Sequence, residues 1–214
     1  MSKMFAIGDI HGCIDKLKAL IAIIGADPAD DTLVFMGDYI DRAGGGPDVV
    51  DYVLALRNKY HKVVCLCGNH EYMLLRYLEG ADEDMYLGNG GLATLKAYGI
   101  SPAESPRKRK SKIPPEHLRF FESLLLYYET QDYLFVHAGL KPGVPLEAQT
   151  AHDLVWVRQE FIESDDDFGK RVIFGHTRSG EPIISLNKIG IDTGAVYGGR
   201  LTCLELPAER FHQV

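Results

Sequence analysis

The stretch TLVFMGDYIDR, residues 32–42, combines the two features on which the fold and the site depend. Its first five residues are mostly apolar, β-branched or aromatic, and the run is too short for a helix, so it predicts a buried strand. Gly37 then breaks the run, and Asp38, Asp41 and Arg42 follow directly. A buried strand that ends in charged side chains predicts that these side chains lie at the carboxyl edge of a sheet.

The same arrangement recurs four more times along the chain. The further strand-like runs are Met4–Ile7, Lys62–Cys67, Tyr133–Val136 and Arg171–Phe174. They are followed, in this order, by Asp9 and His11, by Asn69 and His70, by His137, and by His176. In open α/β sheets, ligands bind at the carboxyl ends of the strands. Five strand ends with metal-competent or acid–base side chains therefore predict one shared site.

Apolar residues at helical spacing fill the gaps between the first runs, and this alternation predicts βαβ units. The last third of the chain holds shorter strand-like pieces at 182–186, 188–191 and 200–206, which predict an antiparallel meander. We expect an α/β sandwich with the sheets inside and the helices outside. The absence of a composition shift predicts a single domain over residues 1–214.

Composition narrows the class of protein. The chain has 214 residues, a formal net charge of −7 and a hydrophobic content of 46%. This balance is ordinary for a globular protein and argues against general nucleic-acid or membrane-surface binding. The apolar run near the N-terminus is far too short for a signal peptide or a membrane span. Four cysteines without regular spacing predict no disulfide framework, so we expect a cytoplasmic protein.

The chemistry of the strand ends suits divalent cations. The candidate ligands are Asp9, His11, Asp38, Asn69, His137 and His176. These oxygen and nitrogen donors suit manganese, iron or zinc, and six of them exceed what one ion with an open position needs. A pair of ions about 3.5–4 Å apart, bridged by Asp38, fits better and would clamp the oxygens of a displacement at phosphorus. Few carboxylates and neutral imidazoles leave such a centre positively charged, which suits a phosphate.

Three further side chains suit the remaining chemistry. His70 is the candidate general acid for the leaving oxygen, because it adjoins a ligand without being needed as one. Asp41 is the expected partner that fixes the tautomer of His70. Arg42 would present a planar fork to two phosphoryl oxygens.

The motifs GDIHG, GDYIDR, GNHE, FVHAG and FGHT, in this order and spacing, resemble the PPP-type branch of the calcineurin-like metallophosphatases. Within that branch the chain looks most like the compact bacterial and phage serine/threonine protein phosphatases. The closing segment 191–206 is also similar to the family, so the resemblance covers nearly the whole chain.

The resemblance implies a four-layer α/β-β-α sandwich with mixed sheets, and a helical insert around residues 80–127. It implies two divalent ions, usually manganese. Asp9, His11 and Asp38 would hold one ion, and Asp38, Asn69, His137 and His176 the other. It makes His70 the acid paired with Asp41, it makes Arg42 and Asn69 phosphate contacts, and Arg158 is the best match to a second phosphate-binding arginine. One departure is that Ala43 and three glycines follow Arg42 where the family has a single glycine.

The resemblance implies a serine/threonine protein phosphatase, in which metal-bound hydroxide attacks phosphorus while His70 protonates the leaving oxygen. The substrate would be a phosphorylated protein or a small phosphorylated compound. The alternative is a hydrolase of dinucleoside polyphosphates, whose family members share the metal motifs. A third class, a non-catalytic scaffold, would predict losses among the metal or acid positions, and none is lost.

Three features have simpler structural interpretations. The basic segment 107–112 lies within the proline-rich stretch 101–115, and we interpret it as a solvated loop rather than a polyanion site. Cys65 and Cys67 lack a second cysteine pair at zinc-finger spacing, and we expect them to fill the core. We attribute Glu71 to the first turn of a helix rather than to the metals.

Overall fold

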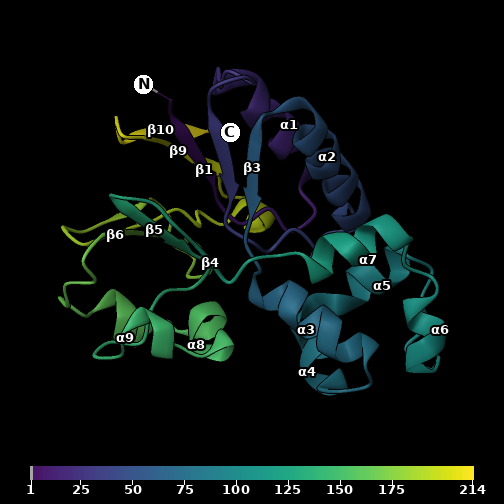
Figure 1. The fold of residues 1–214 in the computed structure, drawn as a ribbon. Coiled ribbons are helices and arrows are strands. Elements are labelled where there is room, and N and C mark those ends of the chain that lie inside the picture. Colours follow the sequence, from purple (N-terminus) through teal and green to yellow (C-terminus); the bar gives the residue numbers. More distant parts are fainter. Residues whose placement is uncertain (1) are drawn as a thin grey trace.

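The computed structural model describes residues 2–214, and two five-stranded sheets form its centre (Figure 1). The first sheet has the order β10-β9-β1-β2-β3. Its strands are β1 (Met4–Ile7), β2 (Thr32–Phe35), β3 (Lys62–Cys65), β9 (Thr202–Leu206) and β10 (Arg210–Gln213). The three N-terminal strands are parallel, β9 is antiparallel to β1, and β10 is antiparallel to β9. The predicted βαβ units therefore supply three of the five strands of this sheet.

The second sheet has the order β4-β5-β6-β8-β7. Its strands are β4 (Tyr127–Glu129), β5 (Tyr133–Val136), β6 (Arg171–Phe174), β7 (Ile183–Ile184) and β8 (Lys188–Gly190). The inner strands β5, β6 and β8 are parallel, and the edge strands β4 and β7 are antiparallel to their neighbours. Both sheets are thus mixed, as predicted.

Side-chain alternation along the strands separates three apolar clusters. On β1, Phe5 and Ile7 face the cluster that also holds apolar residues of α1 (Ile14–Ile23) and α2 (Gly46–Lys59). Ala6 points the other way, into a cluster between the two sheets that includes Ile173 of the second sheet. A third cluster joins the outer face of the second sheet to α8 (Ala151–Trp156) and α9 (Gln159–Ile162). The order helix, sheet, sheet, helix confirms the predicted four-layer sandwich.

The remaining helices gather beside the first sheet, at the lower right of Figure 1. They are α3 (Asn69–Leu78), α4 (Glu83–Tyr86), the π-helical turn η1 (Leu87–Gly91), α5 (Leu92–Ala97), α6 (Pro106–Lys110) and α7 (Pro115–Glu122). Two single 3₁₀ turns, η2 (Leu146–Ala148) and η3 (Ala195–Tyr197), lie in later loops. That the region around 80–127 is an insert within a single domain stays a prediction.

Two predictions about local structure were wrong. The pieces at 182–186, 188–191 and 200–206 do not form one meander, because β7 and β8 belong to the second sheet and β9 to the first. Short strand-like runs show which residues are buried but not which sheet receives them.

The stretch 101–115 is not simply a loop, because Pro106 begins helix α6. Arg109 on this helix is only 4% exposed, pairs with Glu83 at 2.8 Å and stacks over the ring of Tyr77. The lysines of the segment are paired as well: Lys108 and Lys112 with Glu104, and Lys110 with Glu122. Glutamates therefore neutralise most of the positive charge of this segment.

The two cysteines of the GNHE strand lie in the core, as predicted, with exposed fractions of 2% for Cys65 and 6% for Cys67. Among the helices of residues 2–214, none combines the length and the apolar character needed to cross a membrane.

Candidate metal centre

The strand ends converge where the two sheets meet. Asp9 follows β1, Asp38 follows β2, His137 follows β5 and His176 follows β6, while Asn69 is the first residue of α3 after β3. All five side chains are buried. The edge formed by these strand ends lies between the two sheets near the middle of Figure 1. The structure therefore brings together the residues that the sequence predicted to share one site.

The backbone at this edge is unusual. Non-glycine residues with positive φ are His11 (46°), Asp38 (52°), Asp41 (68°), Arg42 (66°) and His176 (60°), together with two residues elsewhere. This left-handed region disfavours side chains with a Cβ atom, and residues held in it concentrate at functional sites. The preceding Gly37 has φ of 104°, and a Cβ atom there would lie 2.6 Å from the amide nitrogen of Gly68. Gly37 is thus what allows the second and third strand-end loops to pack together.

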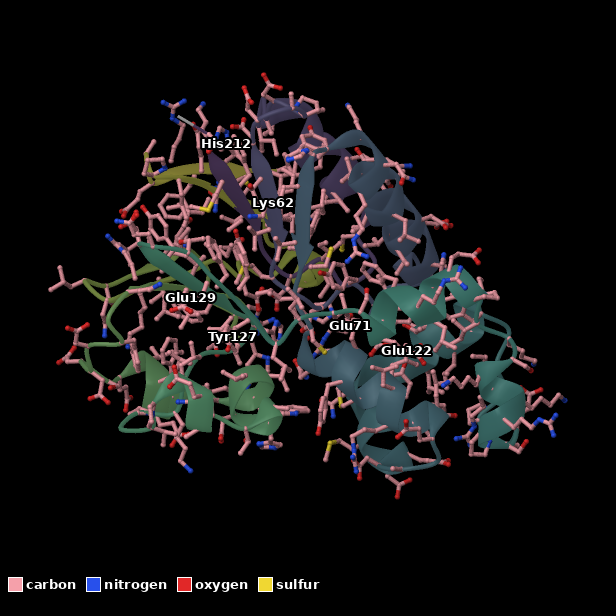
Figure 2. The ribbon with its side chains drawn as sticks, viewed as in Figure 1. Lys62, Glu71, Glu122, Tyr127, Glu129 and His212 are labelled. Carbon is pink, nitrogen blue, oxygen red and sulfur yellow. The ribbon has the colours of Figure 1, made fainter. Side chains whose placement is uncertain are left out.

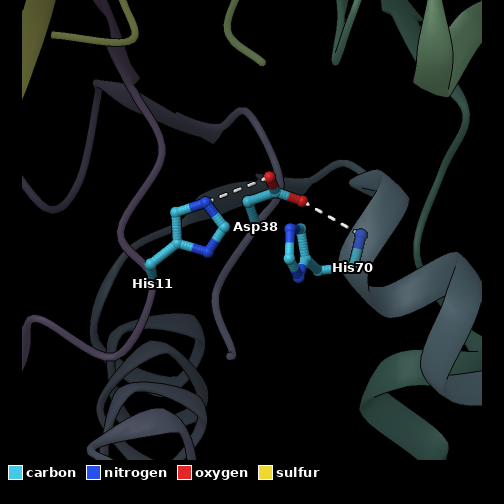
Figure 3. A group of neighbouring side chains, drawn as sticks. All are labelled: His11, Asp38 and His70. Atoms are coloured by element: carbon cyan, nitrogen blue, oxygen red, sulfur yellow. Dashed lines mark hydrogen bonds and ion pairs between the residues drawn. The ribbon is translucent and has the colours of Figure 1, made fainter. Parts of the chain in front are cut away.

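Asp38 lies at the centre of the site and faces imidazoles on two sides. Its Oδ2 is 3.3 Å from Nε2 of His11, and its Oδ1 is 3.5 Å from Nε2 of His137. The main-chain N–H of His70 also donates to Oδ1, at 3.2 Å. Figure 3 shows the Asp38 carboxylate between the rings of His11 and His70. Two groups of potential ligands, His11-Asp38-His70 and Asp38-His137-His176, therefore share Asp38.

The other ring nitrogens fix the tautomers. Nδ1 of His11 donates to the carbonyl of Ile40 at 2.9 Å, and Nδ1 of His137 donates to the carbonyl of Met36 at 2.8 Å. Burial lowers the pKa of both imidazoles, to about 4 for His11, so the neutral form is favoured. The Nε2 atom of each ring then turns a lone pair toward the Asp38 carboxylate. The imidazole nitrogens and the carboxylate oxygens are all hydrogen-bond acceptors, so no hydrogen bond joins them, and a cation between them would bind both.

Further polar atoms lack partners at the same place. Among residues 2–214, Oδ1 of Asp9 and Nε2 of His176 are buried and have no hydrogen-bond partner. Burial, and next the charge of Asp192, raise the pKa of Asp9 well above its usual value. Burial also raises the pKa of Asp38, but the surrounding imidazoles, His137 first, outweigh it and the net shift is downward. Divalent cations would bind the lone pairs of these carboxylate oxygens and imidazole nitrogens. Oxygen and nitrogen ligands of this kind suit manganese, iron or zinc.

The predicted acid and its partner are in contact. Nδ1 of His70 donates to Oδ2 of Asp41 at 2.7 Å, and both side chains are fully buried. Burial lowers the pKa of His70, but the charges of Asp38 and Asp41 outweigh this effect and raise it. Sequence reasoning missed two supports of this pair. Tyr86 donates its hydroxyl to Oδ1 of Asp41 at 3.0 Å, and Thr94 accepts the main-chain N–H of Asp41 at 2.9 Å.

Glu71 does more than open a helix. Its Oε2 accepts the N–H groups of Asp38 and Gly68, at 2.9 and 3.0 Å, and its Oε1 accepts those of Tyr39 and Ile40, at 2.8 and 3.3 Å. Figure 2 places Glu71 near the centre of the molecule. The carboxylate thus joins the loop that carries Asp38 to the start of α3. Only the Gly68 contact is local, so a first-turn glutamate in sequence could not reveal the other three.

An open cavity of about 350 Å³ lies over the centre, and charged residues line it. Its walls include His11, Asp38, Asn69 and His176, together with the predicted phosphate-binding residues Arg42 and Arg158. The guanidinium of Arg42 donates to Nε2 of His70 at 3.1 Å and to the hydroxyl of Tyr197. The glycine-rich turn η1 also supports Arg42, whose N–H donates to the carbonyl of Gly90 at 3.3 Å.

Sequence reasoning also missed four residues that line the cavity. They are Thr177, Arg178, Asp192 and Tyr197. Burial raises the pKa of Asp192 to about 6. Asp192 belongs to the closing segment 191–206, which carried the family resemblance without any assigned role. Arg178 directly follows the fifth motif, but an arginine in a loop carries no signal by itself.

Comparison with known proteins matches residues 2–210 to the calcineurin-like phosphoesterase model. The chain is 31% identical to bis(5'-nucleosyl)-tetraphosphatase (asymmetrical) PrpE of Bacillus velezensis, over 94% of this chain and 88% of that protein. It is 30% identical to serine/threonine-protein phosphatase 1 of Salmonella typhimurium, over 93% of this chain and 89% of that protein. The cold-active protein-tyrosine phosphatase of a psychrophilic Shewanella species has the same fold, with a TM-score of 0.72 and 18% identity over 100% of this chain and 80% of that one.

Proposed function

The chain belongs to the calcineurin-like phosphoesterase family, and on this premise we propose that it is a dinuclear metal-dependent hydrolase of phosphate esters or anhydrides. One observation carries the proposal: Asp38 faces the lone pairs of His11 on one side and of His137 on the other. An arrangement of acceptors around a shared carboxylate suits two cations better than one. Hydrolysis at phosphorus is one reaction for which such a pair is used, and it is the reaction of this family.

The ligand assignment follows the family pattern. Asp9, His11 and Asp38 would hold one ion, and Asp38, Asn69, His137 and His176 the other. The unpartnered Oδ1 of Asp9 supports this assignment, and so does the approach of Nδ1 of His176 and Nε2 of His137 to the Asn69 side-chain oxygen, at 2.9 and 3.2 Å. When bound, two divalent cations lower the pKa of water and supply Lewis acidity at the phosphoryl oxygens. We propose manganese as the metal, and iron and zinc suit the same donors.

The chain's own residues would bind the phosphoryl group and deliver the proton. Arg42 and Arg158, at the wall of the cavity, would bind phosphoryl oxygens through charge-assisted hydrogen bonds, and Asn69 would add its amide. His70 would protonate the leaving oxygen. The bond from its Nδ1 to Asp41 leaves Nε2 as the atom that would carry the transferred proton. In the structure Nε2 accepts from Arg42, so the acid and a phosphate-binding group adjoin, and protonated His70 would exchange this bond for one to the leaving oxygen.

Two classes of substrate fit this centre. The Salmonella relative supports the phosphoprotein phosphatase that the sequence predicts, with phosphoserine and phosphothreonine as substrates. The Bacillus relative supports a dinucleoside polyphosphate hydrolase at a similar identity. Both reactions break a P–O bond at the same reacting phosphoryl group, so the difference between them lies in what the protein binds beyond that group. A cytoplasmic location and the absence of nucleic-acid partners stay predictions.

The direct test is hydrolysis of p-nitrophenyl phosphate by chelator-treated protein before and after manganese is added. We expect activity only after the addition, and a loss of at least a hundredfold in Asp38→Asn, because one substitution removes the ligand common to both ions. Activity that survives the chelator, or an Asp38→Asn variant with wild-type activity, would refute the dinuclear mechanism.

A further inference from the structure

The mouth of the cavity carries more positive charge than one phosphoryl group requires. Arg42, Arg158 and Arg178 all line the cavity, and all three are exposed. Within residues 2–214, no carboxylate forms an ion pair with any of them. Three unpaired guanidinium groups around one opening stand out in a chain with a net charge of −7. Such a cluster points to an anionic ligand with several charges.

The course of the Arg178 side chain is defined by its surroundings. Its stem crosses the backbone of Gly194, where a Cβ atom would lie 2.9 Å from Cδ of Arg178. Its guanidinium lies 4.4 Å from the centre of the Tyr197 ring, and the Arg42 guanidinium lies 5.3 Å from the same centre. Contacts between an arginine and an aromatic face are favourable even at exposed sites. Tyr197 therefore contacts both arginines.

The loop that carries Tyr197 is anchored from outside the cavity. Nζ of Lys16, on helix α1, donates to the carbonyl of Ala195 at 2.9 Å and to that of Gly199 at 2.5 Å. The Tyr197 side chain itself stays 52% exposed, so it is not a core residue that happens to face the cavity. The anchored loop, its exposed Tyr197 and the adjacent Arg178 therefore form a preorganised binding surface, because they lose little conformational freedom when a ligand binds.

We propose that Arg178, held against Tyr197, binds a second phosphoryl group of the substrate, the one bonded to the phosphoryl group that reacts. This inference rests on the proposed function and names its substrate class: a phosphoanhydride such as a nucleoside polyphosphate, rather than a simple monoester. Arg42 and Arg158 suffice for the oxygens of the reacting group. The guanidinium of Arg178 then binds the adjacent phosphate of a polyphosphate substrate. A phosphoserine side chain has no such second phosphate.

The test compares two substrates in the same manganese solution, diadenosine tetraphosphate and p-nitrophenyl phosphate. For Arg178→Gln we expect kcat/KM to fall about tenfold more with the first substrate than with the second, the usual size of one charge-assisted contact. Arg178→Lys keeps the charge and should recover part of that loss. Arg200→Gln is the matched control, because Arg200 lies on the loop that carries Tyr197 but its side chain bonds to Gln213, and both activities should stay at wild-type values.

A second readout does not depend on turnover. Isothermal titration of the manganese-loaded protein should show pyrophosphate binding more tightly than orthophosphate, and Arg178→Gln should reduce this preference about tenfold. Equal losses for both ligands or both substrates, or a larger loss with a phosphopeptide than with the dinucleotide, would overturn the inference while leaving the proposed function intact. If the wild-type protein hydrolyses no phosphate compound, the proposed function fails, and the titration alone decides the role of Arg178.

Discussion

Replacing Glu71 by glutamine should damage the metal centre and the fold together. In the structure, Oε1 and Oε2 each accept two main-chain N–H groups, and the side chain has no exposed surface. Glutamine has the same shape but only one acceptor oxygen. Its NH₂ group would face two buried N–H donors in either orientation, so at least two donors would lose their partner.

The size of the effect follows from that count. A buried donor without a partner costs about 1–3 kcal/mol, so the free energy of unfolding should fall by about 2–6 kcal/mol. For a chain of this length, 1 kcal/mol corresponds to about 2–4 °C in Tm, so we expect a decrease of roughly 4 °C or more. The main-chain N–H of Asp38 donates one of the four bonds, so the affinity for manganese should fall as well.

Thermal unfolding and manganese titration measure the two effects. Glu122→Gln is the matched control, because Glu122 is the last residue of α7 (Figure 2), its side chain is 47% exposed, and it pairs with the exposed Lys110. Loss of that pair should change the free energy of unfolding by less than about 1 kcal/mol. If Glu71→Gln behaves like Glu122→Gln in both measurements, the account of Glu71 as the link between the two loops is wrong.

Three further substitutions test separate parts of the account. His70→Asn should lower kcat strongly while about two manganese ions stay bound, since it removes the proton donor but no ligand; retained activity on a monoester with a poor leaving group would exclude His70 as the acid. Tyr86→Phe removes the hydroxyl bonded to Asp41 and should lower kcat several-fold, about 1 kcal/mol, at unchanged metal content; an unchanged kcat would show that this bond does not position the pair. Lys188→Met removes the buried ammonium group that donates to the carbonyls of Phe161 and Ser164, each of which keeps one weaker donor, and should lower the free energy of unfolding by about 1–3 kcal/mol without loss of metal; wild-type stability in urea would contradict this.

The sequence predicts the strand ends well because their signal is local. A short apolar run followed by a polar residue specifies both burial and position, so the residue pattern alone assigns Asp9, Asp38, Asn69, His137 and His176 to one edge. The sandwich follows from the same runs, since strands covered on both faces must have helices outside them.

The remaining features depend on contacts between distant segments. Tyr86 lies 45 residues from Asp41, and Lys16 lies 179 residues from Ala195, so no spacing rule connects them. The division of the late strands between two sheets depends on which edge is free, and β9 pairs with β1 at the opposite end of the chain. Arg109 shows the reverse case: its basic neighbours predict exposure, whereas Glu83 and the ring of Tyr77 bury it.

The central claim is that two divalent cations share Asp38, and anomalous diffraction from manganese-loaded crystals tests it most directly, together with elemental analysis of the same protein. The account predicts two manganese peaks, one on each side of the Asp38 carboxylate, about 3.5–4 Å apart, and two ions per chain in solution. It also predicts that Asp38→Ala binds fewer than one ion per chain. A single peak, two peaks remote from Asp38, or an Asp38→Ala variant that keeps both ions would contradict it.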